Sequence, residues 1–199
     1  MEPVSITAGV TALCDRLIQL ASIKSSKQTS IFQNIIQATQ TEFEKVHAQY
    51  VESFKNYRSL IQDARLPLTT EHPVFETLEQ DMLYTLGARG TLWVALEATD
   101  NKKARPYLAL VHAYLKSSIN FFLESETVER HGYAWGINMP RLTLIDRLHV
   151  IFKFGRSDKE KRKDALSAVN AALVDLQNRY LAVIREYTDA KNALLKLNR

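Results

Sequence analysis

The strongest constraint on the fold is a repeating apolar pattern in the last forty residues. Apolar side chains recur there at alternating steps of three and four, and polar residues fill most positions between them. The repeat consists of Leu166, Val169, Leu173, Leu176, Tyr180, Val183, Tyr187, Ala190, Leu194 and Leu197. It predicts one long helix over 158–198, capped by Ser157 or Asp158 and about 60 Å long at the helical rise. Such a helix needs a comparably long partner.

A second stretch, 30–63, has the same spacing and is the expected partner. Its apolar positions are Phe32, Ile36, Phe43, Val46, Tyr50, Phe54, Tyr57 and Ile61. The dipeptide Leu66-Pro67 follows it and disfavours further helix. We therefore predict an all-α fold, an elongated bundle of five or six helices in which 30–63 and 158–198 pack in coiled-coil fashion. The spacing leaves open whether they pair within one chain or between chains.

Composition supports a single helical domain over 1–199. Glycine and proline number only 6 and 5, which suits long helices joined by short loops. Cys14 is the single cysteine, and the chain starts without a basic leader, so we expect a reducing, cytoplasmic location. No apolar run reaches the length of a membrane span. The net charge of +4 is too modest to indicate nucleic-acid binding.

Shorter helices are predicted between and before the two long ones. One begins at His72-Pro73, one runs from Arg105 to about Glu124, and one from Pro140 to near Gly155. Within residues 1–24, the stretch 4–23 is an amphipathic helix that either packs on the bundle or lies on an anionic membrane.

Two acidic–histidine pairs at three-residue spacing share a helix face: Glu44 with His47, and Asp146 with His149. Di-metal helical bundles use this spacing, but they also need two further inward-facing carboxylates. The other predicted helices offer apolar residues at those positions. We therefore expect surface pairs, with no metal and no cofactor.

Two arginine–histidine pairs have six residues between them: Arg65 with His72, and Arg105 with His112. This spacing resembles the Arg-x4-6-His motif of HEPN ribonucleases, which are also all-helical. The resemblance implies that the arginine holds a phosphate and the histidine moves a proton at the ribose hydroxyl. The chain departs from the motif after each arginine, where Leu66 and Pro106 replace the usual polar residue.

Two further features concern surfaces. The basic run from Arg156 to Lys163 is interleaved with acidic residues, which favours a solvated face over a site for RNA or lipid. Tyr133 and Trp135 lie in the least periodic segment, where they either form a recognition tip or close one end of the bundle. Other candidate interaction residues belong to the C-terminal repeat: Leu166, Leu173, Tyr180 and Tyr187.

The opening thirteen residues, MEPVSITAGVTAL, resemble the start of HeLo-like helical domains and of bacterial helical proteins associated with immune or cell-death systems. The resemblance implies a long-helix bundle that oligomerises and an N-terminal segment that engages membrane. Asp15 and Arg16 interrupt the apolar run, so this implied contact is interfacial.

These observations favour a non-enzymatic helical interaction and oligomerisation module. Its expected partner is another protein or a second copy, and the resemblance implies a place in a bacterial immune or cell-death assembly. Two alternatives remain open: an effector that acts on membranes through residues 4–23, and a HEPN-like ribonuclease.

Overall fold

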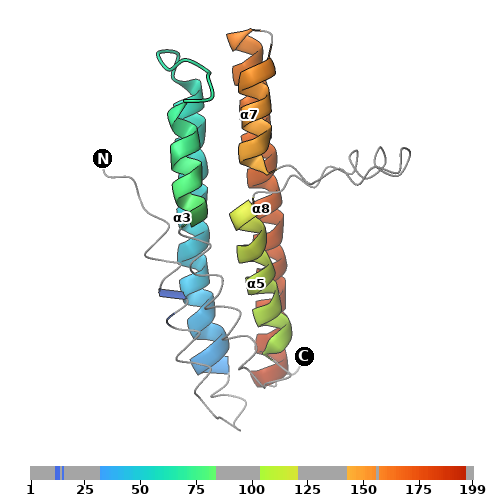
Figure 1. The fold of residues 1–199 in the computed structure, drawn as a ribbon. Coiled ribbons are helices and arrows are strands. Elements are labelled where there is room, and N and C mark those ends of the chain that lie inside the picture. Colours follow the sequence, from blue (N-terminus) through green and yellow to red (C-terminus); the bar gives the residue numbers. More distant parts are fainter. Residues whose placement is uncertain are drawn as a thin grey trace, which may run out of the picture.

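The computed structural model describes residues 12, 13, 15, 32–83, 104–120, 143–155 and 157–195. Every regular element in these ranges is a helix, and the helices run side by side along one long axis (Figure 1). The predicted all-α, elongated bundle is confirmed.

The first long helix begins with a π-helical turn, η1 (Phe32–Gln37), and continues as α3 (Ala38–Gln62). Its buried apolar residues follow the predicted repeat and include Phe43, Val46, Tyr50, Phe54, Tyr57 and Ile61. The helix ends where expected, because the backbone of Asp63 turns to an extended conformation. The N–H of Asp63 still donates to the carbonyls of Ser59 and Leu60, which satisfies the last turn.

The second long helix, α8 (Asp158–Leu195), has 38 residues and packs against η1, α3, α5 and α7. Ser157 caps it as predicted: its hydroxyl accepts from the N–H of Glu160 and donates to that residue's carboxylate. The two long helices thus pair within one chain. This answers the question that the spacing alone left open.

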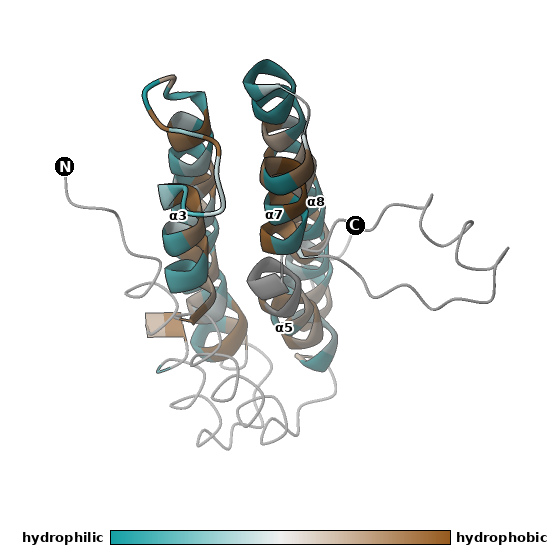
Figure 2. Cartoon of the chain, turned by 45° about the horizontal axis from the view of Figure 1, so that its top comes forward, coloured by the Kyte–Doolittle hydropathy of each residue, from teal (hydrophilic) through white to brown (hydrophobic). Residues whose placement is uncertain are grey.

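The remaining described helices form two layers with this pair (Figures 1 and 2). A helical segment over 73–83 starts at Pro73, as predicted, and lies beside the upper part of α3. On the other side, α5 (Arg105–Asn120) and α7 (Leu144–Phe154) follow one another along α8. Figure 2 shows hydrophilic and hydrophobic residues sharing α3, α7 and α8, as in amphipathic helices.

One boundary and one core face differ from expectation. Helix α7 begins at Leu144, after the predicted start at Pro140, because Thr143 and Asp146 form a reciprocal capping box. The core face of α8 is also rotated from the predicted repeat. Ala165, Ala168 and Ala172 are buried, whereas Leu166 and Leu173 are half-buried. Small residues on this side let a neighbouring helix approach α8 closely.

The end of α3 is held by the start of α8. The guanidinium of Arg162 donates to the carbonyls of Ile61, Asp63 and Leu66, at 2.9 Å for Asp63 and 3.0 Å for Leu66. These carbonyls close the last turn of α3 and the loop after it, so Arg162 acts as a C-terminal cap from another helix. The expectation of a fully solvated basic run is wrong at this residue.

The turn between α7 and α8 requires a glycine for space. A Cβ on Gly155 would lie 2.4 Å from Cγ of Lys161 and 2.7 Å from the carbonyl oxygen of Ile151. The lysine can move, but the backbone oxygen belongs to the last turn of α7. A side chain at Gly155 would therefore distort the last turn of α7.

Candidate functional site

A cluster of aromatic rings joins α3, α5 and α8; we call it the His47 cluster. The ring of His47 stacks on Tyr180, with centroids 3.8 Å apart and an interplanar angle of 9°. Its Nδ1 lies 2.7 Å from the hydroxyl of Tyr114. Phe43 stacks on the Tyr180 ring at 5.7 Å and meets Tyr114 edge-on at 4.8 Å. Three helices are thus connected through one histidine.

Burial lowers the pKa of His47 to about 4, so the ring is neutral at physiological pH. Glu44, its predicted metal partner, is exposed and accepts from Nε2 of Gln40 at 2.8 Å. The Gln40 side chain also accepts from the hydroxyl of Tyr107 at 3.0 Å. Glu44 and Gln40 thus belong to a hydrogen-bond network that links α3 to α5. His47 is engaged separately, because its Nδ1 contacts the Tyr114 hydroxyl.

We expect acid to destabilise the bundle through His47. The folded-state pKa is lower than the unfolded one, so stability is complete above about pH 6.5 and is lost as pH falls toward 4. Because the ring is partly exposed, the loss is about 1–2 kcal/mol after allowance for solvent screening. Urea unfolding at pH 7 and pH 5 should show a smaller drop for His47→Gln than for the unsubstituted chain. An equal drop in both would contradict this assignment, and His149→Gln is the control.

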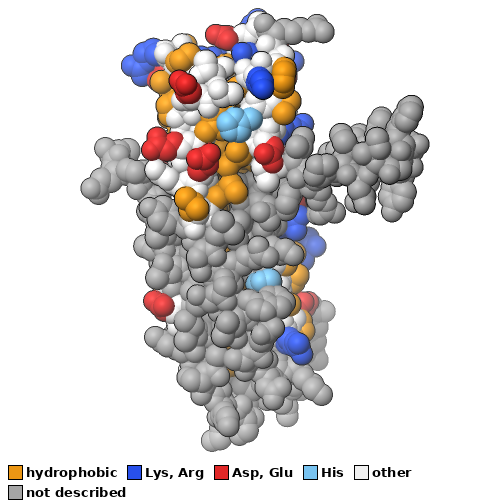
Figure 3. Space-filling view, viewed as in Figure 1, with side chains coloured by type: hydrophobic (Ala, Val, Ile, Leu, Met, Phe, Trp, Pro, Cys, Tyr) orange, Lys and Arg blue, Asp and Glu red, His pale blue; other side chains and the backbone are white. Residues whose placement is uncertain are grey.

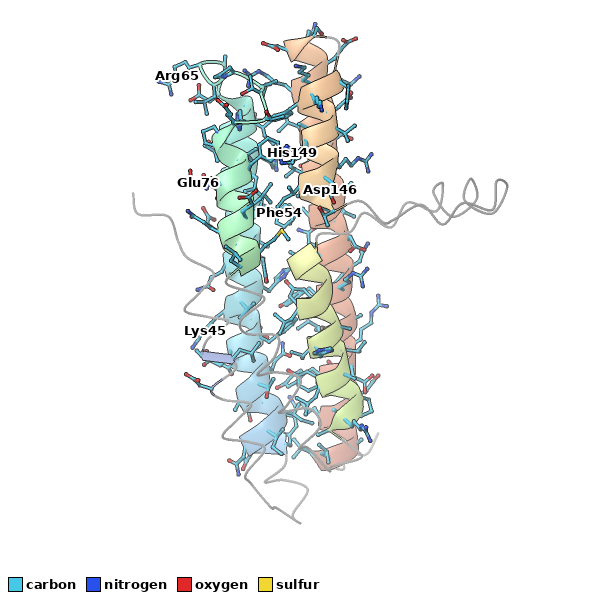
Figure 4. All side chains as sticks on the ribbon, viewed as in Figure 1. Lys45, Phe54, Arg65, Glu76, Asp146 and His149 are labelled. Carbon is cyan, nitrogen blue, oxygen red and sulfur yellow. The ribbon has the colours of Figure 1, made fainter. Side chains whose placement is uncertain are left out.

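The two members of the second acidic–histidine pair have different roles in the structure. Asp146 completes the capping box of α7, where its carboxylate accepts from the Thr143 N–H at 3.0 Å. His149 instead stacks on Phe75 of the 73–83 segment, with centroids 3.9 Å apart. Figure 4 shows His149 between the two layers. Among the described residues, no group of three or more His, Cys, Asp and Glu side chains could hold a metal ion.

The arginine and histidine of the first HEPN-like pair occupy different environments. Arg65 is 89% exposed and pairs with Asp63 at 2.8 Å, and its hydrogen bonds lower the pKa of that carboxyl to about 2. His72 is buried, its Nδ1 accepts from the N–H of Val74, and its ring meets Phe152 edge-on at 5.3 Å. Burial lowers the pKa of His72, and the positive charge of Arg162 adds to this effect. The geometry gives His72 a packing role at the start of the 73–83 segment.

The second pair lies on α5. Arg105 is exposed at the first position of the helix, and His112 is half-buried two turns later.

One buried carboxyl lies outside all the sequence predictions. Asp81 accepts a short hydrogen bond from the Tyr57 hydroxyl, and both side chains are buried. Burial raises the pKa of Asp81, which favours its neutral form. This contact fastens the 73–83 segment to α3, and helical periodicity offers no signal for it.

Several predicted interaction residues are placed against the core or fall outside the described ranges. Leu166, Leu173, Tyr180 and Tyr187 are half-buried and pack against the core within the chain. Tyr133 and Trp135 lie outside the described residues. So does most of 4–23; of that stretch Leu13 is buried in the core, and Ala12 and Asp15 are exposed.

Four large apolar side chains that the sequence analysis did not select are exposed on α7 and α8: Val150, Phe154, Val174 and Leu181. The sequence does contain a signal for these exposed faces. Val174 and Leu181 are seven residues apart, and Val150 and Phe154 are four apart, so each pair lies on one side of its helix. The longer apolar repeat on the opposite face of α8 obscured it. Figure 3 shows a further mixed surface, a histidine surrounded by hydrophobic and acidic side chains on the upper part of the bundle.

Within the part of the chain that the structure describes, no helix is both long enough and apolar enough to span a membrane. No family model matches the chain, and neither a curated protein nor a solved structure is significantly similar to it.

Proposed function

We propose that the chain is a non-enzymatic interaction module that associates with a second copy of itself through the outer face of α8. The observation that carries this proposal is a pair of half-exposed apolar residues, Val174 and Leu181, at 54% and 50% exposure. They lie opposite the core residues of the same helix, which include Leu176 and Val183. We call the surface around them the α8 strip; it comprises Ser167, Asn170, Ala171, Val174, Gln177, Asn178 and Leu181.

The α8 strip contains no charged residue, although all seven of its side chains are exposed. Between Asp164 and Arg185 the only charged residues of α8 are Asp175 and Arg179. Those two form an ion pair at 2.8 Å beside the strip. Exposed helix faces usually mix charges of both signs, so a long face without one is typical of a surface that is covered by a partner.

The strip is suited to pairing with itself. The seven-residue spacing places Val174 and Leu181 at equivalent heptad positions. An antiparallel contact about a two-fold axis near Gln177 and Asn178 sets Val174 of one copy against Leu181 of the other. Because neither surface is charged, the contact carries no repulsion between like charges.

We expect the unsubstituted chain to increase in mass with concentration in light scattering, and V174E/L181E to remain monomeric. Two glutamates on each strip would face two on the other copy, in an apolar contact. The matched control is A48E/Q62E, which adds the same charge at exposed positions of α3. Circular dichroism checks that each variant is folded. A strictly monomeric unsubstituted chain, or equal loss of association in the control, would overturn the proposal.

The role in a bacterial immune or cell-death assembly, which the opening residues imply, remains a prediction. The ribonuclease alternative gains no support from the placement of Arg65 and His72.

A further inference from the structure

The net positive charge of the chain is concentrated in the turn between α7 and α8 and in the helix ends beside it. Residues 147–164 contain seven Lys and Arg against three Asp and Glu, a net charge of +4, and this equals the net charge of all 199 residues. The rest of the chain is therefore neutral overall. We call residues 147–164 the α7–α8 tip; its described residues lie at one end of the elongated bundle (Figure 1).

The tip also exposes apolar side chains. Phe154 is 70% exposed and Val150 is 48% exposed, one helical turn apart on α7. Leu148 and Phe152 of the same helix are buried, so the core face is already occupied and this is a second, outer face. The exposed residues Arg147 and Lys153 share it. The ammonium of Lys153 lies 5.3 Å from the centre of the Phe154 ring.

Five of the seven basic groups of the tip fall into two sets. Arg162 and Lys161 donate to backbone carbonyls of the α3 end and its loop, and therefore serve the fold. Lys153, Lys159 and Lys163 are exposed and make no ion pair with another described residue. This second set is available to an anionic ligand.

We propose that the α7–α8 tip docks on an anionic phospholipid surface. Phe154 and Val150 enter the interfacial region, while Lys153, Lys159 and Lys163 contact the headgroups. The shape favours a membrane over an acidic protein segment. The two apolar side chains project from the convex outer face of a helix at the end of a rod, which suits a broad deformable surface. The proposal is independent of self-association, because the α8 strip begins beyond the tip.

The test is flotation of the full-length chain with two kinds of vesicle, phosphatidylcholine alone and phosphatidylcholine mixed with phosphatidylserine. We expect binding to the mixed vesicles only, and release at high salt, because surface charges are screened. The variant K153E/K159E/K163E should lose at least about tenfold in partitioning, since each basic residue near an anionic surface contributes to binding. The variant V150S/F154S should also bind more weakly, with its charge unchanged.

The matched control is K45E/K55E/K191E, which makes the same charge change at exposed lysines of α3 and α8 away from the tip. It should retain most of the binding. Equal loss in this control would show that total charge, rather than the tip, governs binding, and would overturn the proposal. So would unchanged binding by both tip variants, which would assign the contact to another part of the chain such as residues 4–23. Failure of the unsubstituted chain to float with either vesicle would also overturn it.

Discussion

Leu176→Ala is expected to lower the free energy of unfolding by about 2–5 kcal/mol, the usual cost of removing a buried leucine side chain. Leu176 is 2% exposed on the core face of α8. Leu181→Ala, five residues later on the same helix, should cost less than about 0.5 kcal/mol, because its side chain is half-exposed. The chemical change is identical, so the difference reports only which side of α8 faces the core.

Urea unfolding at a protein concentration low enough to exclude association measures both values. Leu181→Ala should, in addition, weaken the self-association of the chain, whereas Leu176→Ala should not change it in the folded state. Similar stability losses for the two leucines would contradict the orientation of α8.

The second large effect is expected at Arg162. Arg162→Met removes the donors for three partly buried carbonyls and should cost about 2–4 kcal/mol, since hydrogen bonds to a charged group are strong and the carbonyls are left unsatisfied. Arg162→Lys keeps the charge but cannot reproduce the planar arrangement of donors, so an intermediate loss is expected.

Lys163→Met is the matched control, because Lys163 is the next residue and is exposed. Its effect should stay within about 0.5 kcal/mol. Thermal unfolding followed by circular dichroism compares the three variants. If Arg162→Met were no more harmful than Lys163→Met, the cap on α3 would contribute nothing to stability.

The parts of the fold that were predictable are those set by local chemistry. Apolar spacing located both long helices, and Ser157, one of the two expected caps, marked the start of α8. Pro73 marked the start of the 73–83 segment in the same way. Each signal lies within a few residues of the feature it predicts, so one sequence is enough.

Other features depend on residues that are distant in the chain. His47 and Tyr114 are 67 positions apart, and the Ile61 carbonyl that Arg162 caps is 101 positions before it. Nothing at either position indicates its partner. The rotation of the α8 core face has a similar origin. The repeat measured on α8 alone could not include the additional side, with Ala165, Ala168 and Ala172, that neighbouring helices bury.

The candidate surfaces were missed for a related reason. Val174 and Leu181 lie on the same helix as a longer apolar repeat, which hides them in the sequence. Only the burial of the opposite face of α8 shows that these two side chains are exposed to solvent. Conversely, Tyr180 and Tyr187 looked suited to an interface, but they pack against Phe43 and Phe32 within the chain.

The most direct test of the central claim, that the α8 strip meets its copy, is cross-linking through a single cysteine. Asn178→Cys in a chain whose Cys14 is replaced by serine places one thiol near the proposed two-fold axis. With a short bis-maleimide we expect a covalent dimer, and the same reagent on Lys55→Cys, exposed on α3, should leave the chain monomeric. No dimer from Asn178→Cys, or as much from Lys55→Cys, would contradict the account.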